Sequence, residues 1–173
     1  MGFSLNNSAE NESWLAFVRD SNLPEVQAVI LRTSEQAALA RNLTILFYGV
    51  YSQAKQGCSE EPLNMPFVIA QNPIQRRLPT PALEASVIET PFEAQISGGI
   101  LRKNYVKFEK LYLPSELLGG AKFNPVPVFY EGISLDGKEY AGEWSFDERA
   151  TVNLEGKGMF KLLRADRGNL RVR

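Results

Sequence analysis

The chain has 173 residues, of which 44% are hydrophobic and 23% charged, and its formal net charge at pH 7 is −1. These values are typical of a globular protein, and a chain of this length can fold without disulfides or a structural metal. The sequence contains no histidine and one cysteine, Cys58. It therefore excludes an internal disulfide and any catalytic pair of histidine with serine or cysteine.

The sequence shows no pattern of a targeting or membrane-spanning segment. No N-terminal stretch combines a basic start with an apolar run of signal-peptide length. No stretch reaches the roughly 20 apolar residues that a spanning helix needs. We therefore expect a cytoplasmic protein.

Residues 1–57 are predicted to be a helical segment. Ser8 can cap a first helix, and Pro24 suits the first turn of a second helix that continues from Glu25. Thr33 or Ser34 can cap a third helix, because Glu35 and Gln36 follow near the capping-box position.

The third predicted helix has a competing interpretation. Apolar residues from Leu39 to Ala54 recur with a helical period, and Gly57 is a plausible residue to end the helix. Within this stretch, however, Thr44–Tyr51 is rich in β-branched and aromatic residues and contains Gly49. The periodicity favours a helix, with a strand over Thr44–Tyr51 as the alternative.

Residues 58–91 are predicted to form a proline-rich arm or linker. Five prolines interrupt every attempt at a long regular element, namely Pro62, Pro66, Pro73, Pro79 and Pro81. Apolar residues such as Met65 and Phe67 argue against a freely solvated linker. We expect an ordered arm that packs on its own domain or on a partner.

Residues 92–173 are predicted to be a small antiparallel β-sandwich or barrel. Asp136-Gly137 favours a tight hairpin turn between two strands, Val126–Leu135 and Lys138–Phe146. A second hairpin is expected to turn at Ser97-Gly98-Gly99. With the N-terminal helices, the whole chain is predicted to belong to the α+β class.

The strands of this domain also predict a core. Alternation places Tyr140, Gly142, Trp144 and Phe146 on one face of their strand. In the preceding part of the chain, Val106, Phe108 and Tyr112 share one face, and Tyr105, Lys107 and Glu109 share the other. We expect Trp144 and Phe146 to be buried against the strand that contains Val106 and Phe108.

The charges are unevenly distributed along the chain. Residues 1–100 hold six basic and ten acidic residues, whereas residues 101–173 hold thirteen and ten. The final thirteen residues concentrate five cations against Asp166 alone: Lys161, Arg164, Arg167, Arg171 and Arg173. Such a basic end favours a negatively charged partner.

Nothing in the sequence indicates catalysis. Cys58 has Glu60 and Glu61 nearby, which raise the pKa of a thiol and disfavour the reactive thiolate. Neither Ser97-Gly98-Gly99 nor Gly156-Lys157-Gly158 has the spacing of a phosphate-binding loop. We therefore expect no enzymatic activity, no metal and no cofactor.

The function predicted from these features is that of a non-catalytic interaction or assembly subunit of a larger complex. Its expected contact residues are those of the arm and the basic end: Met65, Phe67, Lys161, Arg164, Arg167, Arg171 and Arg173. The alternative is a small β-barrel that binds single-stranded nucleic acid on a basic C-terminal surface. Its expected residues are Lys103, Tyr105, Lys107, Lys110, Lys161, Arg164, Arg171 and Arg173. The sequence leaves the identity of the partner and the oligomeric state open.

Overall fold

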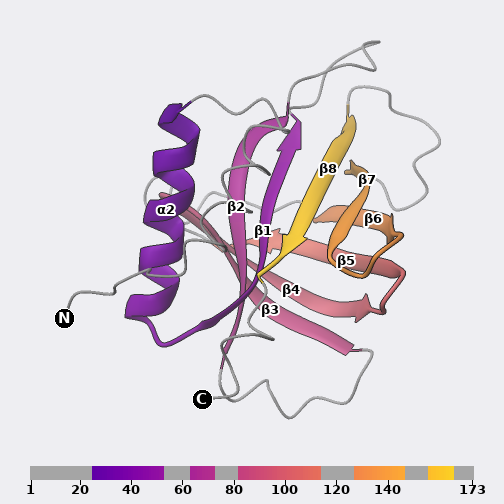
Figure 1. The fold of residues 1–173 in the computed structure, drawn as a ribbon, viewed down its shortest axis with the longest axis horizontal. Helices are drawn as coiled ribbons and strands as arrows, with labels where there is room; N and C mark the ends of the chain where they lie inside the picture. Colours follow the sequence, from indigo (N-terminus) through magenta and orange to yellow (C-terminus); the bar gives the residue numbers. More distant parts are fainter. Residues whose placement is uncertain (1–24, 53–62, 73–81, 114–126, 147–155, 166–173) are drawn as a thin grey trace.

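A computed structural model describes residues 25–52, 63–72, 82–113, 127–146 and 156–165. These residues form a helix followed by eight antiparallel strands that close into a barrel (Figure 1). The elements are α2 (Glu25–Ala40), β1 (Thr44–Ser52), β2 (Leu63–Gln71), β3 (Ala82–Glu89), β4 (Phe92–Leu101), β5 (Tyr105–Tyr112), β6 (Val128–Ser134), β7 (Glu139–Ser145) and β8 (Lys157–Arg164). The α+β prediction and the antiparallel barrel are confirmed.

The strand order follows the chain. Each strand pairs with the next one, and β1 pairs with β8 from Phe47–Arg164 to Tyr51–Phe160, which closes the sheet. Closure removes the free edges that an open sheet exposes. One end of the barrel is therefore formed where β1, β3, β5 and β7 finish and β2, β4, β6 and β8 begin.

Alternation along the strands fills the barrel with side chains. On β5, Val106, Phe108 and Lys110 are buried, whereas Tyr105, Lys107 and Glu109 are half-buried on the outside. Tyr140 and Trp144 point inward from β7, as predicted, and Trp144 is 4% exposed. Phe146 corrects the prediction, because it is 47% exposed just beyond the end of β7, where its ring contacts Trp144.

Glycines on the inner face make room for the aromatic rings. A Cβ at Gly49 would lie 2.4 Å from the ring of Phe67, and one at Gly132 would lie 2.9 Å from the ring of Phe160. Gly142, opposite Gly132 in the register, would bring a Cβ to 2.0 Å from the backbone oxygen of Glu131. These positions need glycine because a side chain would collide with neighbours that pack tightly.

Helix α2 covers the outside of β1, β2 and β3 (Figure 1). Its buried side includes Leu31 and Ala38, which pack with Val50, Val68 and Ile88 from the outer faces of these strands. Ser34 on the same side shares a hydrogen bond of 3.0 Å with the hydroxyl of Thr90. The helix thus covers one side of the barrel.

The helix predicted from Leu39 to Ala54 is wrong beyond Ala40 over the described residues, and the alternative of a strand over Thr44–Tyr51 is confirmed. Helix α2 ends at Ala40, where Asn42 has a φ of 62° and the amide of Leu43 donates to the carbonyl of Ala38 over 2.9 Å. This is the Schellman arrangement that stops a helix. Residues 44–52 form β1, whose alternating burial suits the β-branched and aromatic residues of that stretch. Residues 1–24 and Gly57 lie outside the described residues.

The predicted arm is corrected where the structure describes it. Within residues 58–91, β2 pairs with β1 and β3 pairs with β4, so both are strands of the barrel. Pro62 and Pro81 directly precede these strands, and Pro66 lies outside the short stretch, Val68–Ala70, where β2 pairs with β3. Pro66 pairs with Val50 of β1, and a proline within a strand is tolerated where one side of the strand has no partner.

The two predicted hairpins have different outcomes. The hairpin of β6 and β7 is confirmed, but its connection spans residues 135–138, with positive φ at Gly137. The second turn is wrong, because β4 runs through Gly98 and Gly99 as an irregularity in its pairing with β5. The chain instead turns between Leu101 and Tyr105.

Candidate functional site

Two features of the described residues stand out as candidate sites. The first is a groove of about 330 Å³ on the outside of β5, β6 and β7, here called the outer groove. It is lined by Tyr105, Lys107, Phe129, Tyr130, Glu131, Gly132, Ile133, Ala141, Gly142, Glu143 and Ser145. The second is a buried set of charged and phenolic side chains inside the barrel.

The outer groove lies on strands other than those that α2 covers. Its apolar part includes Ile133, which is 63% exposed, and the half-buried Phe129 on the same strand. Ile133 is thus the most exposed apolar side chain that lines the groove.

The charges at the groove are partly neutralised. Glu131 accepts a hydrogen bond of 2.9 Å from the hydroxyl of Tyr105 and lies 3.7 Å from the ammonium of Lys107. Glu143, exposed on the outer side of β7, forms no ion pair with the residues that the structure describes. The groove therefore combines an apolar surface with one uncompensated negative charge.

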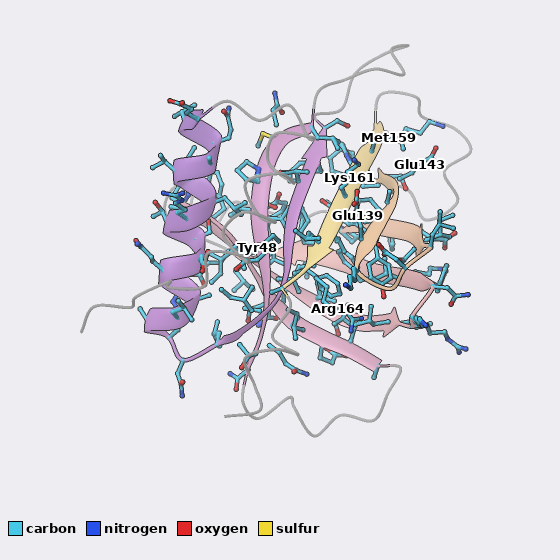
Figure 2. All side chains as sticks on the ribbon, in the orientation of Figure 1. Tyr48, Glu139, Glu143, Met159, Lys161 and Arg164 are labelled. Carbon is cyan, nitrogen blue, oxygen red and sulfur yellow. The ribbon has the colours of Figure 1, made fainter. Side chains whose placement is uncertain are left out.

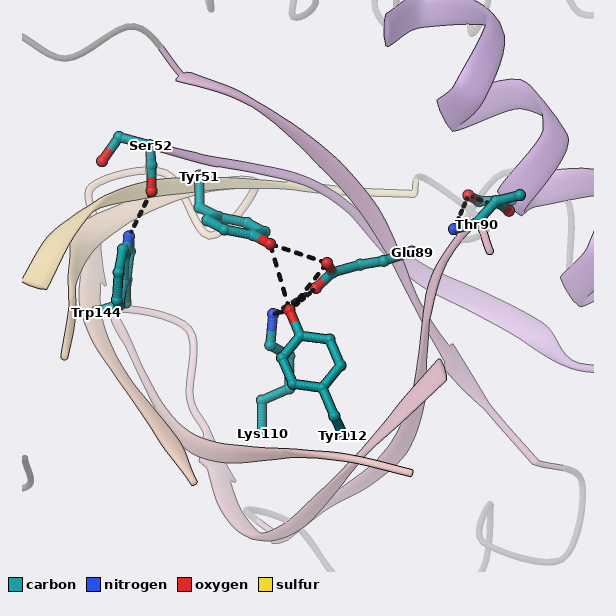
Figure 3. A network of polar contacts seen from close by, with 8 residues as sticks. Tyr51, Ser52, Glu89, Thr90, Lys110, Tyr112 and Trp144 are labelled. Atoms are coloured by element: carbon teal, nitrogen blue, oxygen red, sulfur yellow. Dashed lines mark hydrogen bonds and ion pairs between the residues drawn. The ribbon is translucent and has the colours of Figure 1, made fainter. Parts of the chain in front are cut away.

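The second site is the interior polar cluster, defined as Tyr51 on β1, Glu89 on β3, and Lys110 and Tyr112 on β5 (Figure 3). Lys110 forms an ion pair with Glu89, and its ammonium also donates to the hydroxyl of Tyr112 over 3.0 Å. The hydroxyls of Tyr51 and Tyr112 each donate to Glu89 Oε2 over 2.9 Å.

Aromatic rings enclose the ammonium of Lys110. Its Nζ lies 4.5 Å from the ring centroid of Tyr51, 4.7 Å from that of Tyr112, 5.2 Å from that of Tyr130 and 5.4 Å from that of Phe67. Attraction between a cation and aromatic faces is strongest where water is excluded, as it is here. The side chain of Lys110 is 1% exposed and that of Glu89 is 7% exposed.

Burial governs the protonation of the cluster. It lowers the pKa of Lys110, and the attraction of Glu89 opposes that shift. Burial, reinforced by the charge of Glu89, raises the pKa of Tyr51 and that of Tyr112. Both tyrosines therefore keep their protons at neutral pH and act as hydrogen-bond donors.

Tyr130 completes the surroundings of the cluster. Its ring stacks on Phe108 with centroids 4.7 Å apart, and the side chain is 1% exposed. Burial raises its pKa, with further contributions from Glu89 and Tyr112. Its ring centroid lies 5.2 Å from Lys110 Nζ. Within the described residues, its hydroxyl has no hydrogen-bond partner.

The opposite end of the barrel is held by different contacts. The hydroxyl of Tyr140 donates to the carbonyl of Arg102 over 2.6 Å and accepts from the guanidinium of Arg164 over 3.3 Å. Arg164 also lies over the ring of Phe47, 5.7 Å from its centroid. These contacts of Tyr140 and Arg164 thus connect β7 and β8 to the turn that precedes β5.

The residues predicted as contact sites do not form one surface in the part of the chain that the structure describes. Phe67 has no exposed area inside the barrel, and Met65 is half-buried at the start of β2. Lys161 lies on the outer side of β8, 3.4 Å from Glu139, and Arg164 lies at the end of β8 (Figure 2). Arg167, Arg171 and Arg173 lie outside the described residues.

Sequence reasoning missed the interior polar cluster, although alternation carries a signal for it. Lys110 stands two residues after Phe108 and two before Tyr112, on the inner face of β5. Glu89 likewise continues the inner series Leu83, Ala85 and Val87 of β3. The signal in the sequence is a charged residue at a strand position that alternation assigns to the apolar face.

Comparison with protein-family models, with characterised proteins and with solved structures found no match to this chain. Among the described residues, no set of three or more acidic or cysteine side chains is grouped to hold a metal ion. Those residues also include no helix with the length and apolar character needed to cross a membrane.

Proposed function

We propose that this protein is a non-catalytic interaction subunit whose contact surface is the outer groove. The observation that carries the proposal is Ile133, a large apolar side chain that is 63% exposed in a groove on the side of the barrel that α2 leaves open. Protein interfaces place such apolar residues at their centres and surround them with polar side chains.

The charge of the groove indicates the kind of partner. Lys107 and Glu131 already lie together, so Glu143 carries the uncompensated charge. A partner segment with a large apolar side chain next to a lysine or arginine would cover Ile133 and pair with Glu143. Such a charge pair at an interface rim contributes to specificity and to the rate of association.

The alternative, binding of nucleic acid to a basic surface, finds less support. Lys110 is buried, Lys107 lies beside Glu131, and Lys161 lies beside Glu139. Three of the cations that would contact phosphates are thus already neutralised by carboxylates. Binding to single-stranded DNA and RNA across a range of salt concentrations tests this alternative, because phosphate contacts weaken steeply with salt.

The interaction is tested by selecting peptides from a displayed random library on the purified protein. We expect enriched sequences that combine a large apolar residue with an adjacent lysine or arginine. Their binding should be lost with Ile133→Ser, which removes the apolar contact, and weakened with Glu143→Gln, which removes the charge.

Two substitutions on α2 serve as matched controls. Val29 is 60% exposed, and Glu25 is exposed in the first turn of the helix. Val29→Ser and Glu25→Gln should leave peptide binding unchanged. Peptides that bind the Ile133→Ser variant as well as they bind the parent protein would refute the outer groove as the contact surface.

A further inference from the structure

The outer groove contains two glutamates that lie directly opposite each other. Glu131 of β6 is in register with Glu143 of β7, and both line the groove from the outer faces of their strands. The Cβ atoms of residues paired in this way lie about 4.5–5.5 Å apart, and like charges at such positions destabilise a sheet. A cation placed between the two carboxylates would remove that repulsion.

The described residues supply only part of this cation. Lys107 lies opposite Glu131 on β5, and its ammonium is 3.7 Å from Glu131 Oε2. The hydroxyl of Tyr105 donates to the same oxygen over 2.9 Å. Within the part of the chain that the structure describes, Glu131 Oε1 and the carboxylate of Glu143 therefore stay open to a partner.

The neighbouring side chains shape the space beside these carboxylates. On the outer face of β7, Ala141 and Ser145 are small, whereas their partners on β6 are the large Ile133 and Phe129. The side chains of β6 thus form an apolar wall above a low floor on β7, and this difference in height produces the groove. A partner residue that reaches the carboxylates must lie along this wall.

We infer that this partner residue is an arginine whose guanidinium bridges Glu131 and Glu143. The inference rests on the proposed function and narrows the partner's cation from lysine or arginine to arginine. A guanidinium is planar and presents five N–H donors in a fixed fork, so one group can donate to two carboxylates. The ammonium of lysine is a compact, strongly hydrated charge without this geometry.

The apolar neighbours of the two carboxylates also suit arginine. Phe129 lies two residues from Glu131 on the same face of β6, and a guanidinium stacks on aromatic rings. Met159, which is 44% exposed on β8, lies opposite Glu143 and offers an apolar surface to the methylene stem (Figure 2).

The inference is tested with the most enriched peptide from the selection described above. This peptide is synthesised in three forms that carry arginine, lysine or citrulline at its basic position. Citrulline keeps the planar shape of arginine and lacks its charge. Fluorescence anisotropy of the labelled peptides measures binding to the full chain. We expect the lysine form to bind about tenfold more weakly than the arginine form, and the citrulline form more weakly still.

Variants of the two glutamates distinguish a bridge from a general attraction between opposite charges. Glu131→Gln and Glu143→Gln should each reduce the preference for arginine over lysine, whereas the loss of a general attraction weakens both peptides by the same factor. Glu139→Gln is the matched control. It makes the same change of charge on the outer face of β7, but Glu139 lies beside Lys161 and does not line the groove. This variant should keep the full preference for arginine.

Three results would overturn the inference while the proposed function holds. The first is a set of peptides that need Ile133 yet carry no arginine. The second is equal binding of the arginine and lysine forms to the parent protein. The third is a preference for arginine that persists unchanged in Glu131→Gln and Glu143→Gln. Binding that does not depend on Ile133 would instead refute the outer groove as the contact surface, and the inference with it.

Discussion

At the scale of single residues, the most unusual feature of this protein is a charged pair inside an aromatic barrel. Burying two charges is expensive, and an ion pair in such a place is often less stabilising than apolar residues of the same volume. Lys110 and Glu89 are held by two tyrosine hydroxyls as well as by each other. Removing one partner therefore leaves a buried charge without compensation.

A double-mutant cycle on this pair should show strong coupling. Lys110→Met and Glu89→Gln are each expected to lower the free energy of unfolding by about 3–5 kcal/mol, and the double variant should lose much less than the sum of these losses. Urea unfolding measures all four proteins. Lys161→Met and Glu139→Gln, which break an exposed pair, should each cost at most about 1 kcal/mol. Additive losses at Lys110 and Glu89 would contradict the structure.

Trp144 is the second residue with a large predicted effect. Its side chain is 4% exposed, and its indole nitrogen donates to the carbonyl of Ser52 over 3.0 Å. Trp144→Ala should lower the free energy of unfolding by about 3–5 kcal/mol because it leaves a large cavity in the barrel. Trp144→Phe should cost less, since it keeps most of the apolar volume. A loss below about 1 kcal/mol for alanine would be incompatible with a buried Trp144.

At the scale of elements, the boundary between α2 and β1 depends on one backbone conformation. Asn42 has a positive φ, and the amide of Leu43 bonds back to Ala38. Asparagine tolerates this left-handed region, and glycine adopts it without steric cost.

Substitutions at Asn42 should follow that preference. Asn42→Gly is expected to leave the free energy of unfolding unchanged or to raise it slightly, whereas Asn42→Ala should lower it by about 1 kcal/mol. Thermal unfolding followed by circular dichroism tests the order of the three proteins. Equal stability of the glycine and alanine variants would argue against the left-handed conformation.

The pairing of β6 and β7 depends on a different property of glycine, the absence of a side chain. A Cβ at Gly142 would lie 2.0 Å from the backbone oxygen of Glu131 and 2.5 Å from the Cα of Gly132. Gly142→Ala should therefore separate the two strands and cost about 1–3 kcal/mol or more. At Gly98, which also has a positive φ, a Cβ would meet nothing within 4 Å. Gly98→Asn should be tolerated, and it serves as the control in the same unfolding assay.

At the scale of the whole molecule, buried tyrosines in the barrel make the free energy of unfolding depend on pH in the alkaline range. Burial raises the pKa of Tyr51, Tyr112 and Tyr130 above the usual value near 10. A raised pKa in the folded state means that the unfolded chain loses these protons first. The stabilisation is then fully present below about pH 10 and is lost as the pH rises further.

Lys110 acts in the opposite direction over a lower range. Its lowered pKa makes the folded state release a proton before the unfolded chain does, so stability rises with pH until the unfolded lysine titrates near pH 10.4. Above that value, the tyrosines alone determine the slope among these four groups. We expect the urea midpoint to fall steadily from about pH 10.5 upward. Tyr112→Phe should flatten this fall, and an unchanged slope in that variant would contradict the buried position of Tyr112.

Much of the β architecture follows from the sequence by itself. Alternation in β5 and β7 correctly placed Phe108 and Trp144 inside and Lys107 outside, because a pleated strand turns successive side chains to opposite faces. The Asp136-Gly137 turn was predictable because few residues other than glycine accept a positive φ. These are local rules, and they hold wherever the strand is placed in the fold.

Tertiary structure decided the rest. Thr44–Ser52 carries both a helical period and β-forming residues, and its pairing with β2 and β8 selected the strand. Leu63–Gln71 contains Pro66, yet it forms a strand, because it pairs with β1, where Pro66 lies opposite Val50, and with β3 over Val68–Ala70. Glu89 and Lys110 belong to strands separated by β4, and the closure of the barrel turned both side chains into one interior. Closure of the barrel depends on all eight strands together, so it cannot be predicted from any short stretch of the sequence.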